Sequence, residues 1–308
     1  MAVKMIEKRV MSSDGEHELV GRVYVPECEP VGLFHVVHGM AEYIRRYDSF
    51  MREMAEEGYI VFGYDHLGHG YTARDASELG FIASRDGDKR LVDDVAVFGD
   101  AVRREYGDKL PYVLLGHSMG SFIVRIAAAK YDMHDKLIVM GTGGPNPVAG
   151  LGKAVIGVIK AFKGEKYISD FVQKIAFGKY NERFQGDGIV GWLTKDEGIR
   201  RKYLSDPFCT FRFTVSAMGD LVRLNSDSNR KTVVGGLNKT KPVLLVSGGE
   251  DPVGDYGKGV KAVYDMLVKS GVNAEIKIYE NCRHEILNET CRAEVISDIR
   301  RFLTEGQR

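Results

Sequence analysis

The sequence predicts an α/β protein in which a mostly parallel central sheet is flanked by helices and interrupted once by a helical insertion. Short apolar runs alternate with longer amphipathic segments at both ends of the chain, and the alternation stops between about Gly144 and Lys239. Several of these runs are apolar nearly throughout, which is typical of strands buried on both faces of a parallel sheet. We therefore expect a core made of residues 1–143 and 240–308, separated by an inserted helical cap at residues 144–239.

The first part of the chain alternates strands with helices. Residues 18–25 (ELVGRVYV) are rich in β-branched side chains, which favour a strand. The further strands expected here are the mostly apolar runs 31–38, 59–64, 111–115 and 136–140. The helices expected between them are 47–57, 91–106 and 118–131, the second of which is ended by a glycine.

The insertion breaks this rhythm, and the last part of the chain restores it. Two amphipathic stretches, 151–162 and 168–177, predict cap helices, and Gly-rich and polar segments follow them. The elements expected after the insertion are a strand at 242–247, a helix at 257–270, a strand at 275–279 and a last helix at about 293–303.

Composition narrows the function classes. The 308 residues are 44 % hydrophobic and 28 % charged with a formal net charge of zero, so the chain lacks the basic excess of a nucleic-acid-binding protein. The N-terminus has no apolar signal-peptide region, and no stretch of 18 apolar residues could span a bilayer. We expect a cytoplasmic protein whose contact with membranes is at most peripheral. Its oligomeric state has no signature in the sequence.

The cysteines carry no recognisable motif. None of the four forms a CxxC pair or lies in a zinc-finger spacing, so we expect no metal site. Without an export signal, we expect all four to be reduced thiols: Cys28, Cys209, Cys282 and Cys291.

The strongest catalytic signal is Gly116-His117-Ser118-Met119-Gly120. It matches G-x-S-x-G between an apolar strand and an apolar helix, which is the context of a nucleophile elbow. There the serine sits on a tight turn and projects from the carboxyl edge of the sheet. Ser118 could instead cap the following helix, but the context favours a nucleophile. His117 should point away from the hydroxyl and act as a packed or hydrogen-bonded supporting residue.

A serine nucleophile needs a histidine base and a carboxylate that orients it. Only two histidines follow Ser118, and His134 lies one helix length away, roughly 20 Å. His284, in the loop after the strand 275–279, is therefore the expected base. The acid belongs in the loop after the strand 242–247, where Pro252 fixes the backbone beside the favoured residue, Asp251. The alternatives that remain open in this loop are Glu250 and Asp255.

Two backbone amides should form the oxyanion hole. One is that of Met119, directly after the nucleophile. The other is that of Met40, in the loop after the strand 31–38, where Gly39 lets the chain turn. This loop could also be an ordinary turn at a strand end.

These segments together resemble the monoacylglycerol lipase and lysophospholipase branch of the α/β hydrolases. The resemblance is carried by HGMAEYIRRY (38–47), GYDHLGHGYT (63–72), GHSMGS (116–121), SGGED (247–251) and RHEILNE (283–289). It implies the α/β-hydrolase fold, the triad Ser118, Asp251 and His284, and the two oxyanion amides. It also implies a substrate-binding acid–arginine pair, Glu42 and Arg46, at the polar end of the pocket. By spacing alone, that pair could be a surface ion pair.

The resemblance further implies a cap that forms a hydrophobic tunnel for one acyl chain. The expected cap helix LGKAVIGVIKAF has an apolar face beside lysines, which could lie on a membrane or could simply pack on the core. One departure bears on the alcohol part of the substrate: Leu287 stands where many monoacylglycerol lipases have a second histidine, three residues after the base.

The sequence thus predicts a serine hydrolase of lipid-like carboxylic monoesters, such as monoacylglycerols, that works through an acyl-enzyme without a cofactor. Its partner would be a small-molecule ester or lipid, and the cap could touch membranes. The alternatives are a lysophospholipase, a short-chain carboxylesterase, an aminopeptidase-like enzyme or a catalytically dead ligand-binding protein of the same fold.

Overall fold

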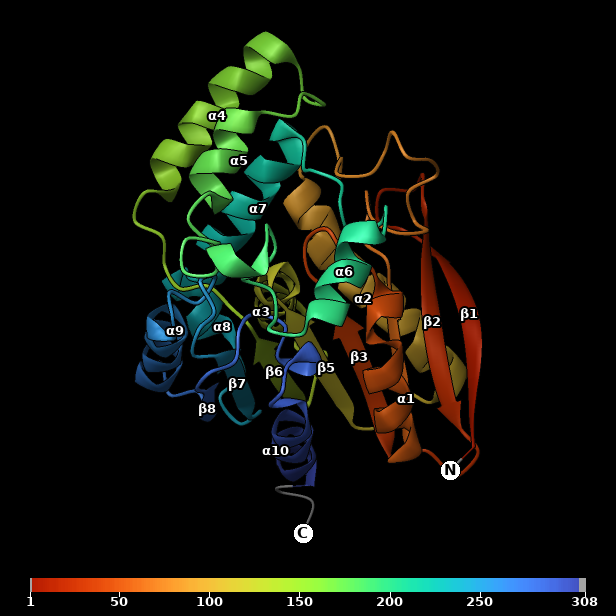
Figure 1. Cartoon of the computed structure of the whole chain (residues 1–308). Coiled ribbons are helices and arrows are strands. Elements are labelled where there is room, and N and C mark those ends of the chain that lie inside the picture. The colour runs from red at the N-terminus through yellow and green to blue at the C-terminus, as the bar shows by residue number, and fades with distance from the viewer. Residues whose placement is uncertain (1, 305–308) are drawn as a thin grey trace.

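A computed structural model describes residues 2–304, which form one twisted sheet of eight strands with helices on both faces (Figure 1). The strand order is β1-β2-β4-β3-β5-β6-β7-β8. Strand β2 runs antiparallel to both β1 and β4, and every other neighbouring pair is parallel. The strands are β1 Val3–Met11, β2 Glu18–Pro26, β3 Gly32–Val37, β4 Tyr59–Tyr64, β5 Tyr112–His117, β6 Lys136–Met140, β7 Val243–Gly248 and β8 Ala274–Tyr279. The predicted fold class is therefore confirmed.

The helices agree with the prediction in the core and exceed it in the middle of the chain. They are α1 Asp48–Glu56, α2 Gly87–Tyr106, α3 Met119–Tyr131, α4 Ala149–Lys163, α5 Asp170–Phe177, α6 Glu197–Ser205, α7 Val215–Ser228, α8 Lys231–Gly236, α9 Lys258–Lys269 and α10 Arg292–Thr304. Strand β1 at the sheet edge is not predicted from the sequence, and neither are α6, α7 and α8, which occupy the Gly-rich and polar segments of the insertion.

Alternating side chains of the central strands build two separate hydrophobic cores. In β3, Leu33 and Val37 face a core that also contains buried residues of α2, α3 and α9. Phe34 and Val36 face the opposite core, which α1 and α10 cover. Because a strand with both faces covered buries nearly all its side chains, β3 to β7 appear in the sequence as mostly apolar runs.

The chain between β6 and β7 carries α4 to α8, and α4 and α5 form the top of the molecule in Figure 1. Helix α7 is largely buried and belongs to the same core as α3. Helix α4 is different, because only Ala149 and Ile156 of its residues are buried. Packing on the core therefore does not account for most of its apolar face. Within residues 2–304, we find no helix long and apolar enough to cross a bilayer.

Candidate active site

The predicted site residues lie in loops at one edge of the sheet. Strands β3, β5, β7 and β8 are parallel, so their carboxyl ends point the same way. The segments that follow them carry the Gly39–Met40 turn, Ser118, Asp251 and His284 respectively. In α/β sheets, ligands bind at this edge because the loops there converge.

Ser118 occupies the sharp turn between β5 and α3. Its backbone has φ 54° and ψ −119°, a conformation that is costly for a residue with a side chain. The Ser118 N–H donates to the Met140 carbonyl of neighbouring β6 at 3.0 Å, which helps to hold this conformation. A Cβ atom on Gly120 would lie 2.2 Å from the Val37 carbonyl oxygen, so the end of β3 leaves room only for glycine there. The elbow is thus held by its neighbours as well as by its own turn, in which the Ser121 N–H donates to the Ser118 carbonyl at 2.9 Å.

His284 and Asp251 are hydrogen-bonded. His284 Nδ1 lies 2.9 Å from Asp251 Oδ2, and both side chains are almost fully buried. The other carboxylate oxygen of Asp251 accepts the Val253 N–H at 2.8 Å. An ionised Asp251 requires a proton on Nδ1, which leaves Nε2 as the basic nitrogen.

The two other acids considered for this role have different surroundings, although Asp255 also lines the cavity beside Ser118. Glu250 pairs with Lys195 at 3.1 Å, and Asp255 is exposed. His134 is buried beyond the end of α3 and takes no part in lining the cavity beside Ser118.

The Gly39–Met40 turn approaches the serine closely. A Cβ atom on Gly39 would lie 3.0 Å from Ser118 Cβ. Within the described part of the chain, no backbone carbonyl or side chain accepts the N–H of Met40 or Met119. Two unused amides near the nucleophile can accept a developing negative charge.

Glu42 is the centre of a buried polar cluster behind this turn. Its Oε1 accepts the Gly39 N–H at 2.6 Å and the Tyr47 hydroxyl at 2.8 Å, and it lies 3.2 Å from His117 Nδ1. Its Oε2 accepts from Arg46 at 2.9 Å. Burial alone would raise the pKa of Glu42, but the hydrogen bond from His117 and the positive charges of His117 and Arg46 hold it well below its usual range. Glu42 and Arg46 are therefore a buried pair rather than a surface pair.

His117 is hydrogen-bonded as expected of a supporting residue. Besides its contacts with Glu42 and Tyr47, its Nε2 lies 3.3 Å from the carbonyl oxygen of His284. Glu285 has no predicted role, although it follows the expected base directly. Its carboxylate binds Arg46 through two hydrogen bonds of 2.7 and 2.8 Å. Trp192 was also missed, and its ring packs against that of His284 with centroids 5.1 Å apart.

A cavity of about 810 Å³ opens beside Ser118 and His284. This volume is in the usual range for small-molecule sites. The polar wall includes Glu42, Arg46 and Glu285, and the rest is largely apolar. The larger apolar side chains from α4, α5 and α7 are Leu151, Val155, Ile156, Val172, Ile175, Phe177, Met218, Leu221 and Val222. The shape can take a ligand with one polar end and one long apolar part.

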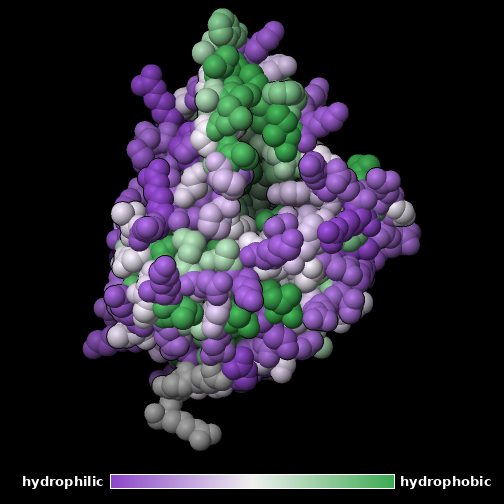
Figure 2. All heavy atoms as spheres, turned by 90° about the vertical axis from the view of Figure 1, so that its left-hand side faces the viewer, coloured by the Kyte–Doolittle hydropathy of each residue, from purple (hydrophilic) through white to green (hydrophobic). Residues whose placement is uncertain are grey.

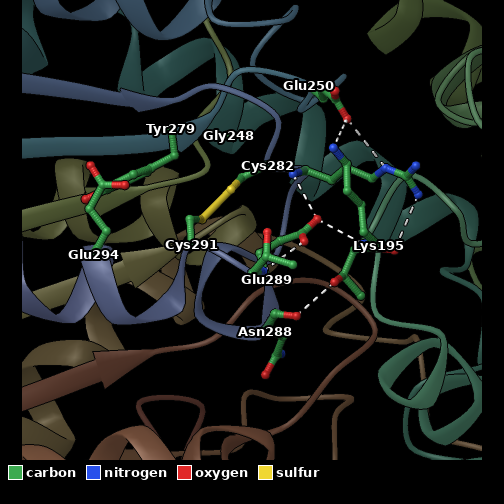
Figure 3. Close-up of a disulfide and its surroundings, with 12 residues drawn as sticks. Lys195, Gly248, Glu250, Tyr279, Cys282, Asn288, Glu289, Cys291 and Glu294 are labelled. Atoms are coloured by element: carbon green, nitrogen blue, oxygen red, sulfur yellow. Dashed lines mark hydrogen bonds and ion pairs between the residues drawn. A yellow bond between two sulfur atoms is a disulfide. The ribbon is translucent and has the colours of Figure 1, made fainter.

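The expectation of four reduced cysteines is wrong, because Cys282 and Cys291 form a disulfide (Figure 3). Their Cα atoms lie 6.6 Å apart, within the range that a disulfide spans. No motif in the sequence predicts this pairing, because the loop must first fold back on itself to bring the two residues together. The closed loop contains His284, and Figure 3 shows Glu289 of the same loop reaching Lys195 of the insertion. Cys28 and Cys209 are free. In residues 2–304, no group of His, Cys, Asp or Glu is arranged to hold a metal ion.

Comparison with known proteins identifies the family of the chain. The family model described as "Serine aminopeptidase, S33" matches residues 28–291. A monoacylglycerol lipase of Mycolicibacterium smegmatis is 25 % identical over 94 % of this chain and 97 % of its own. The mouse monoglyceride lipase is 31 % identical over 91 % of this chain and 84 % of its own. The crystal structure of a thermostable carboxyl esterase from Bacillus coagulans in complex with glycerol superposes with a TM-score of 0.90 at 29 % identity, covering 99 % of this chain and 98 % of that one. The chain therefore belongs to the serine aminopeptidase S33 family of α/β hydrolases and is a relative of the monoacylglycerol lipases.

Proposed function

We propose that this protein is a serine hydrolase of lipid-like carboxylic monoesters and that Ser118, Asp251 and His284 are its catalytic triad. One observation carries the proposal. The buried hydrogen bond between Asp251 and His284 lies at a largely apolar cavity that is also lined by a serine on a strained elbow. Such a bond fixes the tautomer in which His284 Nε2 can take the serine proton.

The reaction follows from the positions of these groups. Ser118 Oγ attacks the ester carbonyl while His284 takes its proton, and the Met40 and Met119 amides stabilise the oxyanion. His284 then protonates the leaving alcohol, which departs and leaves an acyl group on Ser118. A water molecule, deprotonated by His284, attacks this acyl-enzyme and releases the fatty acid. The scheme requires no metal or organic cofactor.

The cavity supports a substrate with one acyl chain. We assign the apolar part, which is built largely by residues 144–239 acting as a cap, to the acyl chain, and the wall at Glu42 and Arg46 to the polar alcohol. Among the described residues that line the cavity, those of the cap include no carboxylate. An aminopeptidase would need negative charge in the cap to bind the free amine of its substrate. The carboxylates of the lining, Glu42, Asp255 and Glu285, all lie outside the cap, which favours an ester. Monoacylglycerols, the substrates named for the relatives, fit this shape, and lysophospholipids are the second candidate.

A fluorophosphonate probe tests the enzyme assignment. The probe should label the wild type at Ser118, and Ser118→Ala should abolish labelling and lower kcat by a factor on the order of 10³ or more. A wild type that stays unlabelled would instead be a catalytically dead ligand-binding protein. Rates over a series of glycerol monoesters of increasing chain length test the substrate class. A preference for acetyl or butyryl esters would contradict a lipase and favour a short-chain esterase.

The exposed face of the cap supports peripheral contact with membranes. Figure 2 shows hydrophobic side chains gathered over the upper part of the molecule, where α4 and α5 lie in Figure 1. The exposed residues of these two helices include Leu151, Val158, Phe162, Phe171 and Ile175, each between 58 % and 84 % exposed. Exposed lysines of the same helices, Lys163 and Lys174, would suit anionic head groups. We assign this face to a lipid surface, from which an acyl chain could enter the cavity.

Sedimentation with vesicles of phosphatidylcholine and phosphatidylglycerol tests the lipid contact. The double variant Phe162→Ser, Phe171→Ser should bind the vesicles more weakly than the wild type. As a matched control, Val268→Ser removes an exposed apolar side chain of α9, outside this face, and should leave binding unchanged. Equal sedimentation of the double variant and the wild type would reject the lipid surface.

A further inference from the structure

Glu285 is held from three directions. Its carboxylate binds the guanidinium of Arg46 with two parallel hydrogen bonds, and its backbone N–H donates to the Leu193 carbonyl of the insertion at 2.8 Å. The side-chain amide of Asn288 donates to the same carboxylate at 3.0 Å. The Glu285 side chain is only 5 % exposed. Two-point pairing of arginine with a carboxylate fixes orientation as well as distance.

Arg46 connects this carboxylate to the oxyanion turn. The nitrogen that donates to Glu285 Oε1 also donates to Glu42 Oε2, and Glu42 in turn accepts the N–H of Gly39. A continuous chain of charge-assisted hydrogen bonds thus runs from the Gly39–Met40 turn to the residue next to His284. Burial would lower the pKa of Arg46, but the charge and hydrogen bonds of Glu285, followed by the charge of Glu42, raise it well above its usual value. Arg46 therefore stays charged, and the chain persists over the working pH range.

The geometry points to Glu285 as a positioning residue for His284. Glu285 acts through Arg46 and Glu42 and keeps the imidazole of His284 aligned with the oxyanion turn. This inference rests on the proposed serine hydrolase mechanism. One peptide bond separates the anchored Glu285 from His284, so a shift of the carboxylate moves the imidazole. A displacement of about 1 Å at a reacting group can cost on the order of 100-fold in rate. No direct contact between Glu285 and the reacting atoms is required.

The variant Glu285→Gln tests this role, because it keeps the size of the side chain but loses its charge and one acceptor. We expect kcat for a soluble ester to fall by about 10- to 100-fold, while KM changes by less than about threefold. The rate of fluorophosphonate labelling should fall by the same factor as kcat, since both steps need His284 as base. The downfield proton resonance of His284 Nδ1–H should also shift or broaden.

A remote buried carboxylate provides the matched control. Asp94 is fully buried and accepts hydrogen bonds from Ser12 and the Ser13 N–H, far from the site in the fold. Asp94→Asn should lower the melting temperature and leave kcat, the labelling rate and the His284 resonance as in the wild type. The positioning role is rejected if Glu285→Gln keeps the wild-type kcat. It is also rejected if Glu285→Gln, like Asp94→Asn, loses activity only in proportion to the fraction of protein that is unfolded.

The experiment separates this inference from the proposed function. A wild type that does not react with the probe overturns the hydrolase mechanism itself. A wild type that reacts, together with a Glu285→Gln variant that reacts equally fast, overturns only the positioning role. A wild type that reacts and a slow variant with a shifted His284 resonance support both.

Discussion

Replacing Gly120 by alanine should move the Gly39–Met40 turn, which carries an oxyanion amide, away from the nucleophile Ser118. The new Cβ would lie 2.2 Å from the Val37 carbonyl oxygen and 2.6 Å from that of His38. Real Cβ atoms essentially never approach other atoms closer than 3.0 Å, so the end of β3 must move away by at least about 0.8 Å. These backbone atoms directly precede the Gly39–Met40 turn. The oxyanion amide of Met40 would therefore move away from Ser118.

The same substitution at a second helical glycine, where the new Cβ meets no other atom, serves as the control. Gly157 lies within α4, and a Cβ there would meet nothing within 4 Å. Gly157→Ala should raise the free energy of unfolding by about 0.5–1 kcal/mol, because alanine loses less backbone entropy in a helix than glycine. For Gly120→Ala, overpacking of about 1–3 kcal/mol offsets this gain, so we expect a net loss of stability. Its kcat should fall on the order of 100-fold, as an oxyanion donor and the nucleophile lose their alignment.

Thermal unfolding and the hydrolysis of a soluble short-chain ester decide between these expectations. In a chain of this length, 1 kcal/mol corresponds to about 2 °C in Tm. Gly157→Ala should have a slightly higher Tm than the wild type and the same kcat. Gly120→Ala should have a lower Tm and a much lower kcat. A Gly120→Ala variant with the stability and kcat of the wild type would refute the argument that β3 and the elbow are in rigid contact.

Three further predictions follow from other contacts. Asp251→Asn should lower kcat on the order of 10⁴-fold in steady-state assays, because the amide favours the wrong tautomer of His284; a loss below tenfold would rule out Asp251 as the orienting acid. His35 is fully buried, and burial lowers its pKa to about 3, so the unfolded state takes up a proton near pH 6.5 that the folded state excludes. When the pH falls from 7.5 to 5, the wild type should therefore lose about 2 kcal/mol more stability than the double variant His35→Phe, Tyr112→Phe, which removes both the imidazole and its hydrogen-bond partner. If urea unfolding shows the same loss of stability in both proteins, this expectation is contradicted. Cys291→Ser opens a loop whose two cysteines are nine residues apart and should cost about 2.5 kcal/mol in urea unfolding; a wild type that loses no stability when reduced would contradict it.

A site residue can be predicted from the sequence when the residues that mark it lie close to it in the chain. Ser118 is marked by its own neighbours, since an apolar strand, two glycines and an apolar helix all lie within one short segment. His284 follows from chain order, because only one other histidine comes after the serine. The acid was less certain, because the sequence offers three carboxylates in one loop, and the hydrogen bond of Asp251 appears only in the structure. Glu285 had no local signal, because its partner Arg46 is 239 residues away.

The same distinction explains the elements that were missed. Strand β1 lies at the sheet edge and mixes charged with apolar residues, so it lacks the continuous apolar run that identified the central strands. Helix α7 buries polar residues, among them Ser216, Asp220 and Ser228, which breaks the apolar periodicity on which a helix prediction depends. The apolar face of α4 was visible in the sequence, but its exposure depends on what the rest of the chain leaves uncovered.

The hydrogen bonds and charges around Glu42 favour the protonated form of His117. Glu42 and Glu285 are two buried carboxylates, and Arg46 supplies one compensating positive charge. Tyr47 donates its hydroxyl proton to Glu42, so its oxygen can only accept from His117 Nδ1. The other ring nitrogen faces the carbonyl oxygen of His284. Both nitrogens of His117 therefore face acceptors and need protons.

The titration of His117 follows from this arrangement. Burial would lower the pKa of His117, but its hydrogen bond with Glu42 and the negative charges of Glu42 and Glu285 raise it above its ordinary value. A raised pKa in the folded state means that this pair stabilises the protein fully below the unfolded value of about 6.5 and loses that effect as pH rises through the folded value. In an NMR titration, the His117 ring protons of the wild type should have a midpoint above 6.5, and Glu42→Gln should lower that midpoint, because the variant loses the charge of Glu42 that opposes the effect of burial. An unchanged midpoint in Glu42→Gln would show that the carboxylate does not hold the proton on His117, and the charge balance argued for this cluster would be wrong.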